Sequence, residues 1–464
     1  MYPRSSLVVI GAVSFLSGIR AGPAPNPAPA PAPAPQLASS VASIFSSATG
    51  AAASALPSIL GDWPSLSDIE KELNINPNSS DLSNILISGL LIPSYANFTG
   101  NGWNLRFYGL AYKLPDVNTS DLDSIINGLS TQNLNSTETS LLQNRTQDLA
   151  AIPVSNANLS AIVSTNGTNI TSTPITLNTT DDVGEFDQFV TISGLGNETG
   201  SVQVVETGLV NVTGPGNGTV ILVPSEGISV VSDIDDVLRI TKVYVPNEGL
   251  KNSFVEPYVN VPGMPDLFQH WLKTLPNASF HYDTTTPMEL TRTYVDYLFA
   301  NYPLGSLEMR PINLTDPSQI LNARQDSLLK LFQTFPHRRF GDTSSSTLLS
   351  AYPQMATQFP NNIACIFIRN TSATDSSDKL PYDTSPFKNV TNGTYFFYNT
   401  ADDLFNLNVT NGECVNASVP QNVQFGEQGG PLGGSSAAAK LSLSVAWTWI
   451  MPACAAALLG LGAL

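Results

Sequence analysis

Three aspartates follow an apolar run in the middle of the chain. The stretch reads Gly227-Ile-Ser-Val-Val-Ser-Asp-Ile-Asp-Asp-Val-Leu-Arg239, and Asp233, Asp235 and Asp236 stand where the apolar residues end. Carboxylates crowded at a strand end repel one another unless a cation neutralises them, and oxygen ligands suit Mg²⁺. The stretch therefore predicts a cation-dependent site. The alternative is an acidic turn followed by the N-terminus of a helix.

Hydroxyl groups end the next expected strand, within residues 278–287. Thr286 and Glu289 have the spacing of a capping box, so a helix is expected to begin directly after Thr286. Free amides at that helix start, beside Thr284 and Thr285, could bind a phosphate. The alternative is that these threonines only cap the helix.

Further helices and strands alternate with these elements. Residues 265–275 and 320–335 have the apolar spacing of helices, and Asp342 follows a glycine at an expected strand end. Alternating strands and helices with acids and hydroxyls at the strand ends predict an α/β fold with a site at the carboxyl edge of a parallel sheet.

The motifs in this region resemble the catalytic domain of the actin-patch-associated phosphatidate phosphatases, within the haloacid dehalogenase superfamily, and most closely its secreted fungal members. The resemblance is carried by Val231-Ser-Asp-Ile-Asp-Asp-Val237, Phe280-His-Tyr-Asp-Thr-Thr-Thr-Pro287, Phe335-Pro-His-Arg-Arg-Phe-Gly-Asp-Thr343 and Cys365-Ile-Phe-Ile-Arg369. It implies a Rossmann-like, haloacid dehalogenase-type domain over residues 225–424.

The resemblance also implies a reaction, the metal-assisted hydrolysis of a phosphomonoester such as phosphatidate. Asp233 would attack phosphorus, and Asp235 would protonate the leaving alcohol and then activate water. Mg²⁺ would lie between Asp233, the backbone carbonyl of Asp235 and Asp342. Thr284 and Thr285 would bind the substrate phosphate. Arg324 is the best substitute for the lysine that the family carries in this helix.

Residues 82–224 have a different pattern, with short β-rich runs broken by Gly, Asn and Pro. This pattern predicts a β-rich, sandwich-like domain. The region is dense in N-x-[ST] sequons, which predict a glycosylated extracellular surface. They include Asn97, Asn118, Asn135, Asn144, Asn158, Asn166, Asn169, Asn178, Asn197, Asn211 and Asn217.

Both ends of the chain carry targeting signals. Residues 1–21 are typical of a cleaved secretory signal peptide, with an uncleaved membrane anchor as the alternative. The Pro/Ala/Ser-rich residues 22–62 predict an extended stalk. Residues 425–464 combine small residues, a spacer and an apolar tail, which is the pattern of a glycolipid-anchor signal with attachment near Gly434, Ser435 or Ser436. An ordinary C-terminal transmembrane helix is the alternative.

The cysteine count agrees with export. If the tail is removed, Cys454 leaves with it, and Cys365 and Cys414 remain as an even pair in an oxidising compartment, where a disulfide is expected.

Net charge and composition exclude some classes of function. The formal net charge of −17 disfavours nucleic acid as a partner, and three histidines without metal-ligand spacing argue against a zinc site. Two hypotheses follow. The first is a surface-anchored Mg²⁺-dependent phosphatase that acts on a phospholipid or small phosphomonoester and is held at the membrane by its lipid anchor. The second is a catalytically degenerate relative that acts as a glycosylated cell-surface or wall protein.

Overall fold

The computed structural model describes residues 83–115, 134–148, 151–214, 216–242, 246–310, 319–344, 351–378, 387 and 389–420. They all lie within one unit of the chain, residues 34–464. The predicted signal peptide (1–21), stalk (22–62) and anchor tail (425–464), with Gly434, Ser435 and Ser436, lie outside the described residues. Among the residues described, no helix combines the length and the apolar character that crossing a bilayer requires.

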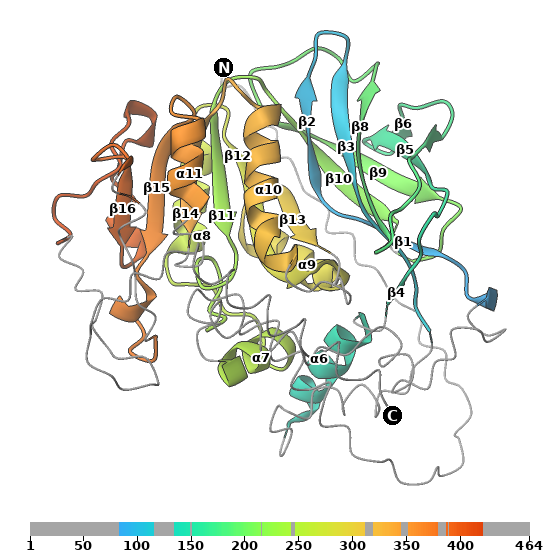
Figure 1. Ribbon diagram of the computed structural model, residues 1–464, viewed down its shortest axis with the longest axis horizontal. Coiled ribbons are helices and arrows are strands. Elements are labelled where there is room, and N and C mark those ends of the chain that lie inside the picture. The colour runs from blue at the N-terminus through green and yellow to red at the C-terminus, as the bar shows by residue number, and fades with distance from the viewer. Residues whose placement is uncertain are drawn as a thin grey trace, which may run out of the picture. The chain divides into compact units, whose positions relative to one another are not determined.

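The first half of the described chain is a mostly antiparallel sheet, here sheet A (Figure 1). Its strands are β1 (Ser88–Leu91), β2 (Ser94–Phe98), β3 (Trp103–Lys113), β4 (Ile152–Pro153), β5 (Ser160–Thr165), β6 (Thr168–Asn169), β7 (Ile175–Thr176), β8 (Glu185–Ile192), β9 (Gln203–Val210) and β10 (Asn217–Val223). Helix α6 (Ser136–Gln147) lies in the β3–β4 connection. The expected β-rich region is confirmed, with its strands hydrogen-bonded into a single branched sheet.

Strand β3 organises sheet A. Along its 11 residues it pairs with β1, β2, β4 and β8. Its side chains alternate between two environments, as the period of a strand requires. Trp103 and Phe107 pack into the apolar core of sheet A, whereas Tyr108 and Leu110 pack into a core that also contains residues of the second sheet. The two sheets therefore share buried apolar surface.

The second half is a parallel sheet, here sheet B, in the order β13-β12-β11-β14-β15-β16. Its strands are β11 (Ile228–Asp233), β12 (Ser279–Pro287), β13 (Ser306–Arg310), β14 (Arg339–Ser344), β15 (Ile363–Arg369) and β16 (Tyr395–Tyr398). The predicted α/β fold with a parallel sheet is confirmed. Every residue of β11 is buried, because β11 is a central strand covered on both faces.

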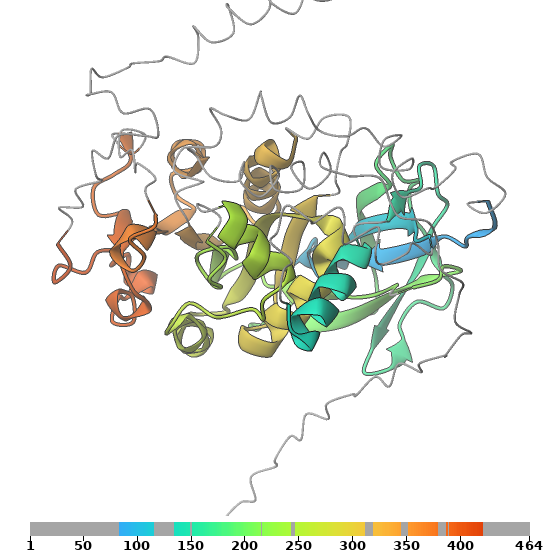
Figure 2. The ribbon, with the colours of Figure 1, turned by 90° about the horizontal axis from the view of Figure 1, so that it is seen from below.

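Helices cover the two faces of sheet B (Figures 1 and 2). The helices of this half are α7 (Pro246–Phe254), α8 (Met264–Thr274), α9 (Thr291–Asn301), α10 (Gln319–Thr334) and α11 (Ala351–Gln358). Apolar residues of α8 and α9 share one core with Val230, whereas those of α10 and α11 share another with Val231. Consecutive residues of β11 thus point to opposite faces.

The helix expected to begin directly after Thr286 begins later. Strand β12 continues to Pro287, a 3₁₀ turn covers Met288–Leu290, and α9 starts at Thr291 without a side-chain cap. The Thr286 hydroxyl contacts the Tyr294 hydroxyl at 2.6 Å instead of capping the helix. Consecutive β-branched threonines favour extended backbone, so the strand prevails over the capping pattern.

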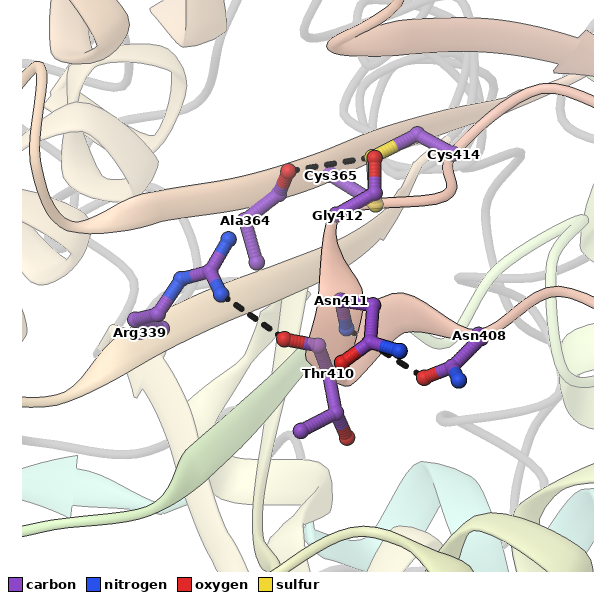
Figure 3. Close-up of a disulfide and its surroundings, with 8 residues drawn as sticks. All are labelled: Arg339, Ala364, Cys365, Asn408, Thr410, Asn411, Gly412 and Cys414. Carbon is purple, nitrogen blue, oxygen red and sulfur yellow. Dashed lines mark hydrogen bonds between the residues drawn. A yellow bond between two sulfur atoms is a disulfide. The ribbon is translucent and has the colours of Figure 1, made fainter.

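A disulfide joins Cys365 of β15 to Cys414 (Figure 3), the pair expected from the sequence. The Cys414 sulfur lies 3.0 Å from the Ala364 carbonyl oxygen, a contact rather than a hydrogen bond because a disulfide sulfur carries no proton. Nearby, Arg339 donates a 3.0 Å hydrogen bond to the Thr410 carbonyl. Closing a loop of 49 residues stabilises the fold by about 4 kcal/mol in the chain-entropy account.

Candidate active site

Strand β11 brings Asp233 to the carboxyl edge of sheet B. Asp233 is the last residue of the strand and its side chain is fully buried. The backbone then turns sharply, because the amides of Leu238 and Arg239 both donate to the Ile234 carbonyl. This turn, and not a helix, follows the aspartates, since α7 starts only at Pro246.

Asp236 stabilises that turn. Its φ of 60° lies in the left-handed region, which Asp tolerates better than most residues. One carboxylate oxygen of Asp236 accepts hydrogen bonds from the amides of Thr241 at 3.0 Å and Lys242 at 2.6 Å. Asp236 therefore holds the loop that carries Asp235, a structural role within the acidic stretch.

Asp235 is buried at the centre of a hydrogen-bonding cluster. Its Oδ2 accepts from the Thr284 hydroxyl at 2.6 Å, and its Oδ1 accepts from the Thr241 hydroxyl at 2.8 Å and from the Tyr294 hydroxyl at 3.1 Å. The guanidinium Nε of Arg239 lies 3.2 Å from Oδ1. Donors on several sides hold the carboxylate in one orientation.

Arg239 is the charge that balances Asp235. It is fully buried, and its guanidinium lies over the rings of Tyr258 at 3.9 Å and Tyr294 at 4.8 Å. Burial opposes the positive charge, but the Tyr294 and Tyr258 side chains and then Asp235 outweigh it and raise the Arg239 pKa above its ordinary value. Arg239, Tyr258 and Tyr294 carry no motif, so sequence reasoning passed over them.

Thr284 lies where the sequence places it, at the same edge as Asp235. In this arrangement its hydroxyl proton is donated to Asp235, while its oxygen accepts from the Thr286 amide at 3.0 Å. One hydroxyl proton serves one acceptor, so Thr284 orients Asp235 here and would have to rotate to donate to a phosphate. Its phosphate-binding role stays a prediction.

Strand β14 places the backbone of Asp342 beside β11. The pairing sets Asp342 opposite Val231 and Thr343 opposite Ser232. Asp342 thus lies two residues, about 7 Å along the strand, before the level of Asp233. The Asp342 side chain lies outside the described residues, as do those of Thr285 in β12 and Arg324 in α10, so their predicted roles in metal and phosphate binding stay predictions.

Two other residues from the sequence motifs lie elsewhere. Arg338 is buried at the amino edge of sheet B, where it donates to the carbonyls of Pro224 at 2.9 Å and Glu226 at 2.8 Å. Burial lowers its pKa to about 10. His281 is buried between the hydroxyls of Ser279 and Ser306, and burial lowers its pKa to about 3. Both are structural.

Comparison with known proteins covers the region of this site. Residues 228–370 match the family model described as the catalytic domain of phosphatidate phosphatase APP1. Phosphatidate phosphatase APP1 of Saccharomyces cerevisiae is 28% identical over 179 residues, covering 36% of this chain and 30% of the relative. The uncharacterized protein C29B5.04c of Schizosaccharomyces pombe is 27% identical over 196 residues, covering 36% and 31%.

The chain thus spans less than a third of the length of these curated relatives. A solved Parabacteroides merdae β-glucuronidase shows 8% identity and a TM-score of 0.21, with 61% of this chain and 40% of that chain covered. A likeness at that level carries no conclusion about fold or function.

Proposed function

We propose that this protein is a Mg²⁺-dependent phosphatase, because residues 228–370 match the family model of the phosphatidate phosphatase APP1 catalytic domain. Its substrate is a phosphomonoester, namely phosphatidate, and its catalysis passes through an aspartyl-phosphate. The observation that carries the proposal is the arrangement of Asp233 and Asp235 at the carboxyl edge of a parallel sheet, with Thr284 in hydrogen-bonding contact with Asp235. The proposed aspartyl-phosphate route is the chemistry of the haloacid dehalogenase superfamily, and the assignment to that superfamily is part of the proposal.

The donors at this edge are of the kind that Mg²⁺ prefers. The buried Asp233 carboxylate and the Asp235 carbonyl are oxygen ligands. Within the part of the chain that the structure describes, no three His, Cys, Asp or Glu side chains gather closely enough to hold a metal. Mg²⁺ is commonly held by one or two carboxylates together with substrate phosphate and water. The Asp233 carboxylate and the Asp235 carbonyl therefore suit Mg²⁺, and Asp342 is a further candidate ligand. When bound, Mg²⁺ would screen the phosphate charge from an anionic nucleophile.

The residues of this chain have separate tasks in the proposed reaction. An Asp233 carboxylate oxygen forms a bond to phosphorus while the bond from phosphorus to the alcohol oxygen breaks, and Asp235, which has taken up a proton before this step, gives that proton to the alcohol oxygen. Asp235 then takes a proton from water, which attacks phosphorus and releases inorganic phosphate and free Asp233. Thr241, Thr284 and Tyr294 keep Asp235 oriented in both steps.

We also propose that the protein acts at the cell surface, exported by its leader and held by the glycolipid anchor of its tail. The exposure of the β-rich region supports glycosylation there. Asn97 is half-buried, and the other described sequon asparagines of this region are exposed. These are Asn135, Asn144, Asn158, Asn166, Asn169, Asn178, Asn197, Asn211 and Asn217. An anchor would also offset the repulsion between a chain of net charge −17 and an anionic bilayer.

Substitution of Asp233 tests the proposal. Purified full-length protein is assayed on phosphatidate with Mg²⁺, and Asp233→Asn should lower kcat by about 10⁴-fold or more, as expected when a nucleophile is lost. Chelation of Mg²⁺ should abolish turnover of the wild type. The matched control Asp236→Asn keeps an oxygen acceptor for the loop amides and should retain most of the activity. Equal activity of wild type and Asp233→Asn would falsify the mechanism.

The second candidate is a glycosylated surface or wall protein without turnover. Two observations favour it: the β11–β14 pairing places Asp342 two residues before Asp233, and Arg324 stands in place of a lysine. A planar guanidinium does not reproduce the point charge of an ammonium group. This candidate prevails if the wild type hydrolyses neither phosphatidate nor p-nitrophenyl phosphate in the presence of Mg²⁺.

A further inference from the structure

A cleft of about 620 Å³ opens on the carboxyl side of sheet B, next to the acidic turn. Asp236 lines it, and Asp236 follows the candidate acid Asp235 directly in the chain. The ends of β15 and β16 supply its other side through Arg369 and Asn399. Small-molecule sites typically measure about 300–1,000 Å³, so the cleft has room for one ligand of modest size.

The lining of the cleft has a polar part and an apolar part. One part offers hydrogen-bonding groups: Lys242, Arg369, Asp375, Asn399, Thr400 and Asp402. The other part is apolar: Ile240, Val261, Pro262 and Ala401. Such a lining matches an amphipathic molecule whose oxygens face donors while its methylene groups face apolar side chains.

The polar part is preformed. The Asp403 carboxylate accepts from the amides of Asn399 at 2.8 Å and Thr400 at 3.1 Å, and these bonds fix the loop after β16. Arg369 is buried and donates to the Asp236 carbonyl and, at 3.1 Å, to the Thr374 hydroxyl. Groups already held in place lose little conformational entropy when a ligand binds.

We propose that this cleft binds the glycerol backbone and ester oxygens of an acylglycerol phosphate, with the hydrocarbon chains extending out of it. The inference rests on the proposed function, because it assigns the cleft to the alcohol side of the same substrate. Ester oxygens only accept hydrogen bonds, and Arg369, Asn399 and Thr400 are donors. Lys242 also pairs with Glu248 at 2.8 Å and Asp375 at 3.1 Å, so of its three ammonium protons one is left for a ligand. The cleft holds a drug-sized ligand and not two long acyl chains.

Binding to the full-length Asp233→Asn protein tests the inference without turnover. The probe is dihexanoyl phosphatidate, which is studied as monomers in solution, and its Kd is measured by calorimetry with Mg²⁺ present. Asp402 is exposed at the cleft, so Asp402→Trp should fill part of it and raise the Kd at least about tenfold. The substitution removes a negative charge, which alone would favour an anionic ligand. Weaker binding of the variant would therefore show that the tryptophan side chain occupies space that the ligand needs.

Glu413→Trp is the matched control, because Glu413 is an exposed acid of the same C-terminal segment outside the cleft lining. It should leave the Kd unchanged. Glycerol 3-phosphate, which lacks the esters and chains, should bind at least about tenfold more weakly than the diester. An unchanged Kd for Asp402→Trp, or equal binding of the two ligands, overturns the inference.

Turnover of acetyl phosphate by protein with Asp233 intact separates the two proposals, because its small leaving group does not need the cleft. If neither acetyl phosphate nor phosphatidate is hydrolysed while Asp402→Trp still weakens binding, the phosphatase proposal fails and the cleft stands as an acylglycerol phosphate site. If acetyl phosphate is hydrolysed and Asp402→Trp binds dihexanoyl phosphatidate normally, catalysis stands and the cleft assignment fails.

Discussion

Arg106 and Arg239 are both fully buried and both pair with carboxylates, but they lie in different parts of the molecule. Arg106 of β3 contacts Asp187 of β8 through two hydrogen bonds of 2.8 and 2.9 Å, and it also contacts Glu308 of β13. Its partners are far away in the sequence and belong to both sheets. Arg239 pairs with Asp235, four residues earlier, at the edge that carries Asp233.

The comparison shows that a buried charge does not by itself indicate a catalytic site. Around Arg106, the Pro93 carbonyl, directly before β2, accepts a 2.8 Å hydrogen bond from the Leu307 amide of β13, and Tyr108 donates to the Met309 carbonyl. All of these contacts join sheet A to sheet B. Around Arg239, the donors converge on one carboxylate at the carboxyl edge of a parallel sheet, where ligands of α/β folds bind.

The largest effect is expected at Arg239, where stability and activity should both fall. Arg239→Met leaves Asp235 buried without its cation, which costs about 3–5 kcal/mol of unfolding free energy. The proposed acid also loses its orientation, so kcat should fall at least about tenfold. Urea denaturation and phosphatase assays measure the two effects. Arg239→Lys, which keeps the charge, should recover part of both, and a Met variant with normal kcat contradicts the positioning role.

Arg106→Met should affect stability alone. Asp187 and Glu308 lose their shared cation at the junction of the sheets, and the expected loss is again about 3–5 kcal/mol in urea denaturation. The kcat per folded molecule should stay normal, because Glu308, although level with Asp233 in sheet B, lies two strands away from it. A kcat as low as that of Arg239→Met would remove the distinction between the two regions.

Thr284→Val should lower activity, with a smaller loss of stability than in the two arginine variants. The variant keeps the shape of the side chain but removes the 2.6 Å hydrogen bond to Asp235, and hydrogen bonds to charged groups are worth about 1.5–3 kcal/mol, or roughly 10- to 150-fold in kcat. Thr274→Val is the control, since that exposed hydroxyl donates to the His270 carbonyl of its own helix. Unchanged kcat in Thr284→Val would show that Thr284 serves neither Asp235 nor the phosphate.

Acid should weaken the contact that Arg106 and Asp187 make where sheet A meets sheet B. Burial raises the pKa of Asp187, but hydrogen bonds and charge from Arg106, with help from Lys330, outweigh it and lower the pKa to about 2. A carboxylate with a lowered folded-state pKa stabilises the fold above its unfolded pKa, about 4, and loses that contribution as pH falls toward 2. The difference in unfolding free energy between wild type and Asp187→Asn should shrink by about 2 kcal/mol between pH 5 and pH 2. A constant difference over that range contradicts the pairing.

The sequence alone determined the features that depend on local pattern. Apolar periodicity placed α8 and α10 within a residue or so of their observed ends, and the run before Asp233 predicted a buried strand that ends in acids. The alternation of these elements predicted the parallel sheet. Periodicity is sufficient here because burial of a continuous apolar face decides whether such segments are helices or strands.

Only the tertiary structure decided how the polar groups are partnered. Asp236 holds a turn, Thr284 donates to Asp235, and the Thr286 hydroxyl, expected to cap a helix, belongs to β12 and contacts Tyr294. Arg239 pairs directly with Asp235 and lies over the rings of Tyr258 and Tyr294, which arrive from separate segments. The reason is physical: a polar side chain binds the nearest buried donor or acceptor, and which group is nearest depends on how distant segments pack, a property that no local pattern records.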